Sequence, residues 1–189
     1  MELRKLTLGK PTKLLVLLVA SMLIATASAA VYYSMIVQPT MTIGVPPVTF
    51  TQGNDWSGIL SLGTNSTWAG LALKAYPNVT WTYEQVLNVS NADTVGHDFR
   101  LRPTSITPAS GSSDVGNFTF INFCVKDANG VVQTTFNYTT SGYTWTVPST
   151  TAYVPLPAET QWIICIETRG AAGATSDISA SIGITLDIK

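Results

Sequence analysis

The chain is poor in the residues that most catalytic and metal sites require. It has one histidine, His97, and two cysteines, Cys124 and Cys165, among 189 residues. A Ser-His-Asp triad needs a histidine base held by a carboxylate, and zinc or blue-copper sites need several histidine or cysteine ligands. Asp98 follows His97 directly, and neighbouring residues of a strand face opposite ways. The sequence therefore predicts a protein that is not an enzyme and holds no metal or cofactor.

Charged side chains are also scarce, at 11% of the chain. Beyond residue 29 there are six basic and ten acidic residues, and the basic ones form no cluster in the sequence. Binding to a nucleic-acid backbone depends on clustered lysine and arginine side chains. Nucleic acid is therefore not an expected partner.

The N-terminus has the layout of an export signal. Four basic residues precede or begin the apolar run Leu14–Ala25, and Ala27-Ser28-Ala29 then matches the small-residue pattern that signal peptidase recognises. We expect cleavage between Ala29 and Ala30, with Val31 as an adjacent alternative for the first residue. Cleavage after Ala29 removes residues 1–29 and leaves an extracellular chain with no membrane span. The alternative is an uncleaved anchor that extends from Leu14 to about Val37.

After this segment the apolar residues alternate at the period of a β-strand, and no stretch has a convincing helical period. The last predicted strand is the clearest, with one apolar face formed by Ile178, Ala180, Ile182, Ile184, Leu186 and Ile188. Residues Trp162–Ile166 are apolar on both faces, which is typical of a central strand. Asp127-Ala128-Asn129-Gly130 predicts a hairpin turn. Residues 47–189 are therefore predicted to form one all-β domain, a sandwich of two antiparallel sheets.

Cys124 and Cys165 each lie in a predicted strand. An even number of cysteines in an exported chain predicts a disulfide. This bond would close a loop of 42 residues and stabilise the fold by about 3–4 kcal/mol through chain entropy. The alternative is two separate buried side chains on strands that are not neighbours, and the sequence leaves both arrangements open.

The segment after the cleavage site has the longest alternation in the chain. Apolar residues occupy the odd positions: Val31, Tyr33, Met35, Val37, Pro39, Met41, Ile43 and Val45. Fully extended, this segment spans about 50 Å, whereas typical strands have about five or six residues. One interpretation is a donor strand that leaves its own subunit and adds to a sheet of the next, which propagates into a fibre. The other is two ordinary strands of the same sandwich, Val31–Val37 and Thr40–Val45.

A family resemblance favours the donor strand. The passage Thr82-Tyr83-Glu84-Gln85-Val86-Leu87-Asn88-Val89-Ser90-Asn91, leading into Phe99-Arg100-Leu101, resembles the TasA/camelysin family of biofilm-matrix proteins and the archaeal bundling pilins related to it. The similarity extends over the mature chain through architecture more than through a sharp motif, and the Lys/Asp-rich surface of bacterial members is missing. It implies a jelly-roll-like sandwich with residues 30–46 as the donor strand. Identical subunits would then form an extracellular homopolymer, and neighbouring filaments would bundle.

Five Asn-x-Ser/Thr triplets are candidate N-glycosylation sites, at Asn65, Asn78, Asn88, Asn117 and Asn137. N-linked glycan is therefore an expected partner, although a threonine-rich chain also produces such triplets by chance. Among the tryptophans, Trp56 and Trp68 lie beside small polar residues and are predicted to be exposed or to line pockets that receive a neighbour's strand. Trp81, Trp145 and Trp162 are predicted to be core. Two other functions stay open: a monomeric surface domain that binds glycans through exposed aromatic rings, and a type IV pilin-like subunit with a retained N-terminal helix.

Overall fold

The computed structural model describes residues 10–11, 13–15, 17–19, 21, 44–174 and 178–189. The chain divides into two compact units, Met1–Ile43 and Gly44–Lys189. In the first unit, the described residues between 10 and 21 are helical. No helix in the described parts of the chain is both long and apolar enough to cross a bilayer. Ala29 and Ala30, at the predicted cleavage site, lie outside the described residues.

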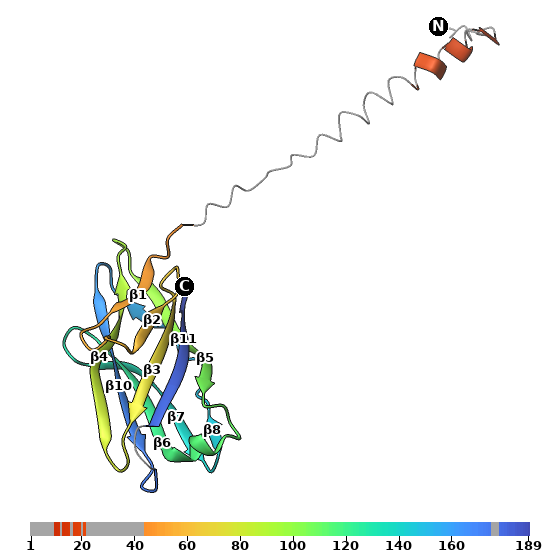
Figure 1. The fold of residues 1–189 in the computed structure, drawn as a ribbon. Helices are drawn as coiled ribbons and strands as arrows, with labels where there is room; N and C mark the ends of the chain where they lie inside the picture. The colour runs from red at the N-terminus through yellow and green to blue at the C-terminus, as the bar shows by residue number, and fades with distance from the viewer. Residues whose placement is uncertain (1–9, 12, 16, 20, 22–43, 175–177) are drawn as a thin grey trace. The chain divides into compact units, whose positions relative to one another are not determined.

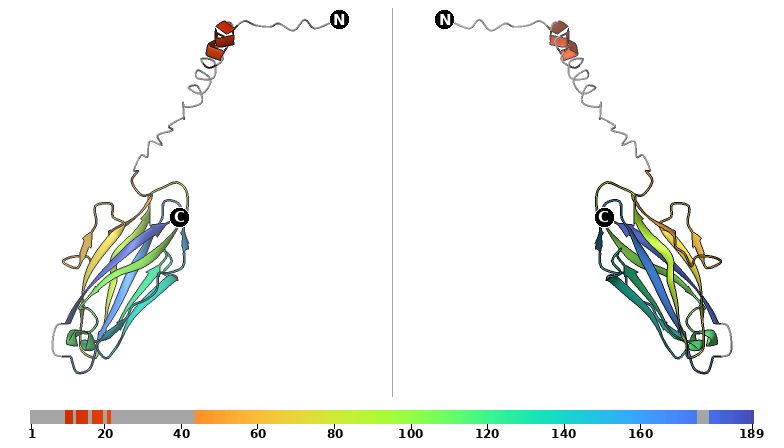
Figure 2. Two further views of the ribbon diagram at one scale, coloured as in Figure 1. Left: turned by 90° about the vertical axis from the view of Figure 1, so that its right-hand side faces the viewer. Right: turned by 90° about the vertical axis from the view of Figure 1, so that its left-hand side faces the viewer.

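The second unit is built from β-strands, with one short 3-10 helix, η1 (Ser113–Asn117). Within the described residues the strands are β1 (Val48–Gln52), β2 (Leu60–Leu62), β3 (Trp68–Ala75), β4 (Thr80–Asn91), β5 (His97–Thr107), β6 (Phe118–Lys126), β7 (Val132–Ser141), β8 (Thr144–Thr146), β9 (Val154–Leu156), β10 (Gln161–Gly170) and β11 (Ile178–Ile188). They form two sheets that pack face to face (Figures 1 and 2).

Strand order identifies the sandwich as a jelly roll. Sheet A has the order β1-β4-β10-β6-β7-β8 and sheet B the order β2-β3-β11-β5-β9, with antiparallel pairing throughout. The four strands β4-β10-β6-β7 lie opposite β3-β11-β5-β9, which is the arrangement of two Greek keys in a jelly roll. The predicted all-β, two-sheet antiparallel sandwich is confirmed.

The core lies between the sheets and follows the alternation in the sequence. The apolar face of β11 points inward, and its residues from Ile178 to Leu186 are buried at every second position. β10 is a central strand of sheet A, with β4 and β6 on its two sides.

The predicted turn between β6 and β7 is also confirmed. Asp127 Oδ1 accepts hydrogen bonds from the backbone N–H groups of Asn129 and Val131, and Gly130 has a φ of 80°. Gly130 therefore occupies the left-handed region that favours glycine.

The tryptophans follow the predictions with one exception. Trp145 and Trp162 are buried, and Trp56 and Trp68 are exposed by 41% and 40%. Trp81 is 45% exposed, so its placement in the core was wrong. Its side chain shares a strand face with buried Tyr83, as alternation requires, but it lies near the end of the sandwich where less of the core covers it.

Cys124 in β6 and Cys165 in β10 are directly paired in the register of sheet A and are joined by a disulfide, with their Cα atoms 5.3 Å apart. Their neighbours Phe123 and Ile164 are fully buried in the core. Because successive residues alternate between the two faces of a strand, the disulfide lies on the outer face of sheet A.

Candidate strand-acceptor edge

The predicted donor strand begins outside the described residues. This applies to Val31, Tyr33, Met35, Val37, Met41 and Ile43, while Val45 is described, is 88% exposed and belongs to no strand. The chain then enters β1 at Val48, which pairs with Asn91 at the C-terminal end of β4. Any segment that precedes Gly44 therefore joins the sandwich at this end of β4.

The edge of sheet A is only partly covered by β1. β4 has 12 residues, and β1 pairs with Leu87–Asn91 alone. The loop after β1 continues with two backbone hydrogen bonds, to the carbonyl groups of Val86 (3.1 Å) and Gln85 (3.0 Å). In the described part of the chain, no strand pairs with Thr80–Glu84 on the side away from β10, so this stretch is an open edge of the sheet (Figure 1). We call Thr80–Glu84 the open edge of β4.

Side chains on the open edge alternate between polar and aromatic. The exposed polar ones are Thr80, Thr82 and Glu84. Trp81 and Tyr83 share the opposite face, with ring centroids 6.4 Å apart, and Tyr76 packs against Trp81 at 5.2 Å. β3 of the facing sheet ends at Ala75, and nearly half of the Trp81 surface remains open to solvent. The open edge thus combines backbone groups available for pairing with an accessible aromatic surface.

In the facing sheet B, side-chain hydroxyls occupy the backbone hydrogen-bonding groups of Lys74 in β3. The Tyr83 hydroxyl accepts a hydrogen bond from the Lys74 backbone N–H (2.9 Å) and donates to the Lys74 carbonyl (3.4 Å). The Thr168 hydroxyl donates to the same carbonyl at 2.6 Å. Burial raises the pKa of the Tyr83 phenol, which keeps its proton available for this bridge between the sheets. An added strand therefore finds its backbone partners on β4 rather than on β3.

Four of the five candidate glycosylation sites are accessible. Asn65, Asn78 and Asn137 are exposed, and Asn117 is half-buried. Asn88 is 2% exposed, which disfavours a glycan at this predicted site. Its side-chain amide donates to the Gln52 carbonyl (3.0 Å) and accepts from the Gln85 side chain (3.0 Å), so a glycan on this nitrogen would have no room.

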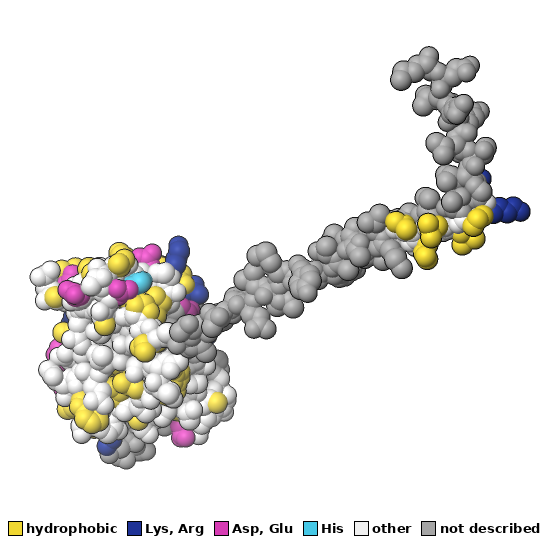
Figure 3. Space-filling view, turned by 90° about the horizontal axis from the view of Figure 1, so that it is seen from above, with side chains coloured by type: hydrophobic (Ala, Val, Ile, Leu, Met, Phe, Trp, Pro, Cys, Tyr) yellow, Lys and Arg dark blue, Asp and Glu magenta, His cyan; other side chains and the backbone are white. Residues whose placement is uncertain are grey.

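The one histidine has a local structural partner. His97 Nε2 lies 2.9 Å from Asp93 Oδ2, and this contact lowers the pKa of Asp93. Seen from this end, further acidic and basic side chains lie near the histidine, and most of the remaining described surface is uncharged (Figure 3). Among the described residues, no group of His, Cys, Asp and Glu side chains is arranged to hold a metal ion.

Sequence reasoning missed the open edge of β4 because it depends on how far β1 extends along its neighbour. The five residues of β1, the twelve of β4 and their pairing register are seen in the structure, and no local sequence pattern indicates them. No protein-family model matches the chain, and no curated protein sequence matches it.

Proposed function

We propose that the protein is a structural subunit of an extracellular filament. After export, the donor strand, residues 31–45, leaves its own subunit, and part of it pairs with the open edge of β4 in the next subunit and extends its sheet A. The interface joins two different surfaces, so each subunit has both a donor and an acceptor, and assembly continues into a homopolymer. The proposed role in the filament is structural and involves no catalysis.

The observation that supports the proposal is that the described chain enters the sandwich beside one end of β4, whereas the open edge lies at the other end of this strand. The N-terminal segment joins the sandwich beside Asn91, and the open edge begins at Thr80. Eleven residue steps along an antiparallel strand correspond to about 37 Å. Subunits stacked end to end therefore bring the donor of one next to the acceptor of its neighbour. Within a single subunit, β1 and the loop after it already occupy the intervening length of β4.

Side-chain patterns support the same pairing. Added strands gain affinity from backbone hydrogen bonds and specificity from alternating side chains. The donor has apolar side chains at odd positions, and the open edge has Trp81 and Tyr83 on the face toward the core. With the odd positions of the donor on the inner face, its apolar side chains would cover Trp81, and its polar side chains would lie beside Thr82 on the outer face. An uncovered edge of this kind would otherwise promote uncontrolled association.

A cysteine cross-link tests the pairing directly. Ser34→Cys in the donor and Thr82→Cys in the open edge both replace polar residues on the outward face. Because the register is not fixed, Thr42→Cys serves as a second donor position. Under oxidising conditions at least one donor variant should give a ladder of disulfide-linked oligomers with Thr82→Cys. The matched control is Thr146→Cys in β8, the strand at the other edge of sheet A, which should give no ladder.

Deletion and imaging provide the complementary test. Removal of residues 31–45 should leave a monomer, and negative-stain images of the full mature chain should show filaments. Filaments that persist after the deletion would refute strand donation. A cross-link within one chain instead of between chains would favour the alternative in which the segment folds back into its own sandwich. N-terminal sequencing that begins at Ala30 would exclude the retained-helix pilin.

A further inference from the structure

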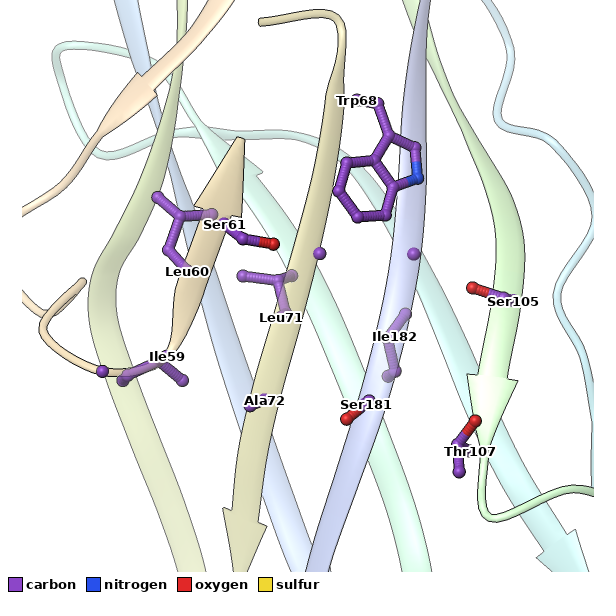
Figure 4. Close-up of a pocket in the computed structure, with 13 residues that line it drawn as sticks. Ile59, Leu60, Ser61, Trp68, Leu71, Ala72, Ser105, Thr107, Ser181 and Ile182 are labelled. Carbon is purple, nitrogen blue, oxygen red and sulfur yellow. The ribbon is translucent and has the colours of Figure 1, made fainter. Parts of the chain in front are cut away.

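The outer face of sheet B carries an open hollow of about 440 Å³ that the proposed filament contact does not use. It extends across β2, β3, β11 and β5, and Trp68 lies at one end of it (Figure 4). Volumes of about 300–1,000 Å³ are usual for small-molecule sites. None of the residues that line the hollow is charged.

The floor of the hollow is made of unusually small side chains. Ser61, Gly70, Gly183 and Ser105 are neighbours in the register of four adjacent strands and form one row across the sheet. Ala72, Ser181 and Thr107 form the next row. In sheet B, β3 lies between β2 and β11, and β11 lies between β3 and β5. The backbone groups of both strands are therefore hydrogen-bonded to their neighbours, and the floor offers no free edge to an added strand.

Trp68 lies against this floor with its indole ring over two glycines. A Cβ atom on Gly70 would lie 2.6 Å from Trp68 Cη2, and one on Gly183 would lie 3.3 Å from Trp68 Nε1. Gly70 is therefore required for the ring to approach the sheet so closely, whereas a Cβ atom on Gly183 would only make a tight contact with the ring. With the ring covering the glycines and 40% of the residue exposed, one side of the indole is presented to the hollow.

Hydroxyl groups surround the aromatic surface. The pairing of β11 with β5 passes from Gly183–Ser105 to Ile184–Pro103, so Thr104 is an extra residue in a β-bulge. Bulges re-aim side chains, and here the hydroxyls of Thr104 and Ser105 both lie beside Gly183, at 2.7 and 2.5 Å from a Cβ built there. The side chains of Ser61, Ser181 and Thr107 add further hydroxyls around the hollow (Figure 4).

We infer that this hollow is a binding site for a neutral saccharide. A pyranose ring has an apolar face of C–H groups that can stack on an exposed indole, and its hydroxyls exchange hydrogen bonds with serine and threonine, which both donate and accept. The absence of charge from the lining favours a neutral hexose or N-acetylhexosamine over an acidic sugar. The engaged backbone of the floor disfavours a peptide strand. This site does not depend on filament formation, because it lies on sheet B and the open edge lies on sheet A.

The test is binding of the full mature chain to an array of neutral and acidic oligosaccharides, followed by calorimetry with the best neutral ligand. Trp68→Ala should weaken this binding at least tenfold, or about 1.4 kcal/mol. Trp56→Ala is the matched control, because Trp56 is equally exposed but lies outside the hollow; it should leave affinity unchanged.

A second variant tests whether binding depends on the position of the Trp68 indole as well as on its presence. Gly70→Ala keeps the indole but displaces it, since the new methyl group would overlap Trp68 Cη2, and it should also weaken binding. Circular dichroism of each variant checks that the sandwich is intact. Lack of binding to every neutral saccharide, equal losses in Trp68→Ala and Trp56→Ala, or a preference for acidic sugars would each overturn the inference.

Discussion

Tyr138 lies in β7 at the centre of an aromatic cluster, with its ring centroid 6.2 Å from that of Phe123 and 6.3 Å from those of Phe136 and Trp145. It is fully buried, and its hydroxyl has no hydrogen-bond partner among the described residues. An unpaired hydroxyl in an apolar interior costs about 1–3 kcal/mol. Tyr138→Phe removes the oxygen and leaves a small void, which at about 24 cal/mol per Å³ costs a few tenths of a kcal/mol. We expect the variant to raise the free energy of unfolding by about 1–2 kcal/mol.

Equilibrium unfolding in guanidinium chloride measures this change, provided that the slope of the transition stays constant. Tyr83→Phe is the matched control, because the Tyr83 hydroxyl is hydrogen-bonded to the Lys74 backbone. Loss of that bridge should lower stability by about 0.5–1.5 kcal/mol. Opposite signs for the two variants support the reasoning. A loss of stability in Tyr138→Phe comparable to that in Tyr83→Phe would refute it and indicate a polar partner for the hydroxyl.

Alkaline pH offers a second measurement on the same side chain. Burial raises the pKa of Tyr138 above its ordinary value of 10.0. A raised pKa in the folded state contributes stability that is complete below the unfolded pKa and is lost as the pH rises through the folded pKa. The free energy of unfolding should therefore fall above about pH 10. This fall should be shallower in Tyr138→Phe, and an identical slope would contradict the burial of the phenol.

Three further outcomes are expected. Replacing both Cys124 and Cys165 by alanine should lower the free energy of unfolding by about 4 kcal/mol, because the bond joins residues separated by 41 positions; a loss below about 1 kcal/mol would contradict this entropy argument. Hydrogen bonds from Arg102 and Arg100 lower the pKa of Asp187 from its usual 3.8, so its stabilisation is present above about pH 4 and lost as the pH falls through the lowered pKa. Asp187→Asn should flatten the acid side of the stability curve, measured by denaturation between about pH 2 and 6. Glycopeptide mass spectrometry should find Asn88 unmodified, and a glycan there would contradict its burial.

The fold could be predicted from local alternation because each strand lies in a two-layer sandwich with one face in the core. The pattern of β11 shows this directly, since the residues predicted to face one way are those that the core buries. The turn at Gly130 was predictable because its left-handed backbone favours glycine. The error at Trp81 has a related cause. Alternation predicts which face of the sheet a side chain lies on. Whether that side chain is buried depends also on where the strands of the opposite sheet end.

The two surfaces that carry the proposals depend on contacts between distant segments. The open edge of β4 exists because β1, more than thirty residues earlier in the chain, covers only Leu87–Asn91. The position of Trp68 depends on Gly70 two residues later and on Gly183 in a different strand. No local pattern connects these glycines with the tryptophan. These residues come together because β3 pairs with β11, and the pairing register of these strands cannot be read from a local sequence pattern.

The disulfide between β6 and β10 also limits how far the chain can extend under mechanical load. If a pulling force unfolds the domain from its two ends, the 41 residue steps between Cys124 and Cys165 stay closed by the covalent bond. At about 3.5 Å per residue, roughly 14 nm of chain is withheld from extension. Rupture of the noncovalent sandwich would then lengthen the chain by that much less, and the strands β7, β8 and β9 would remain within a closed loop instead of being drawn out.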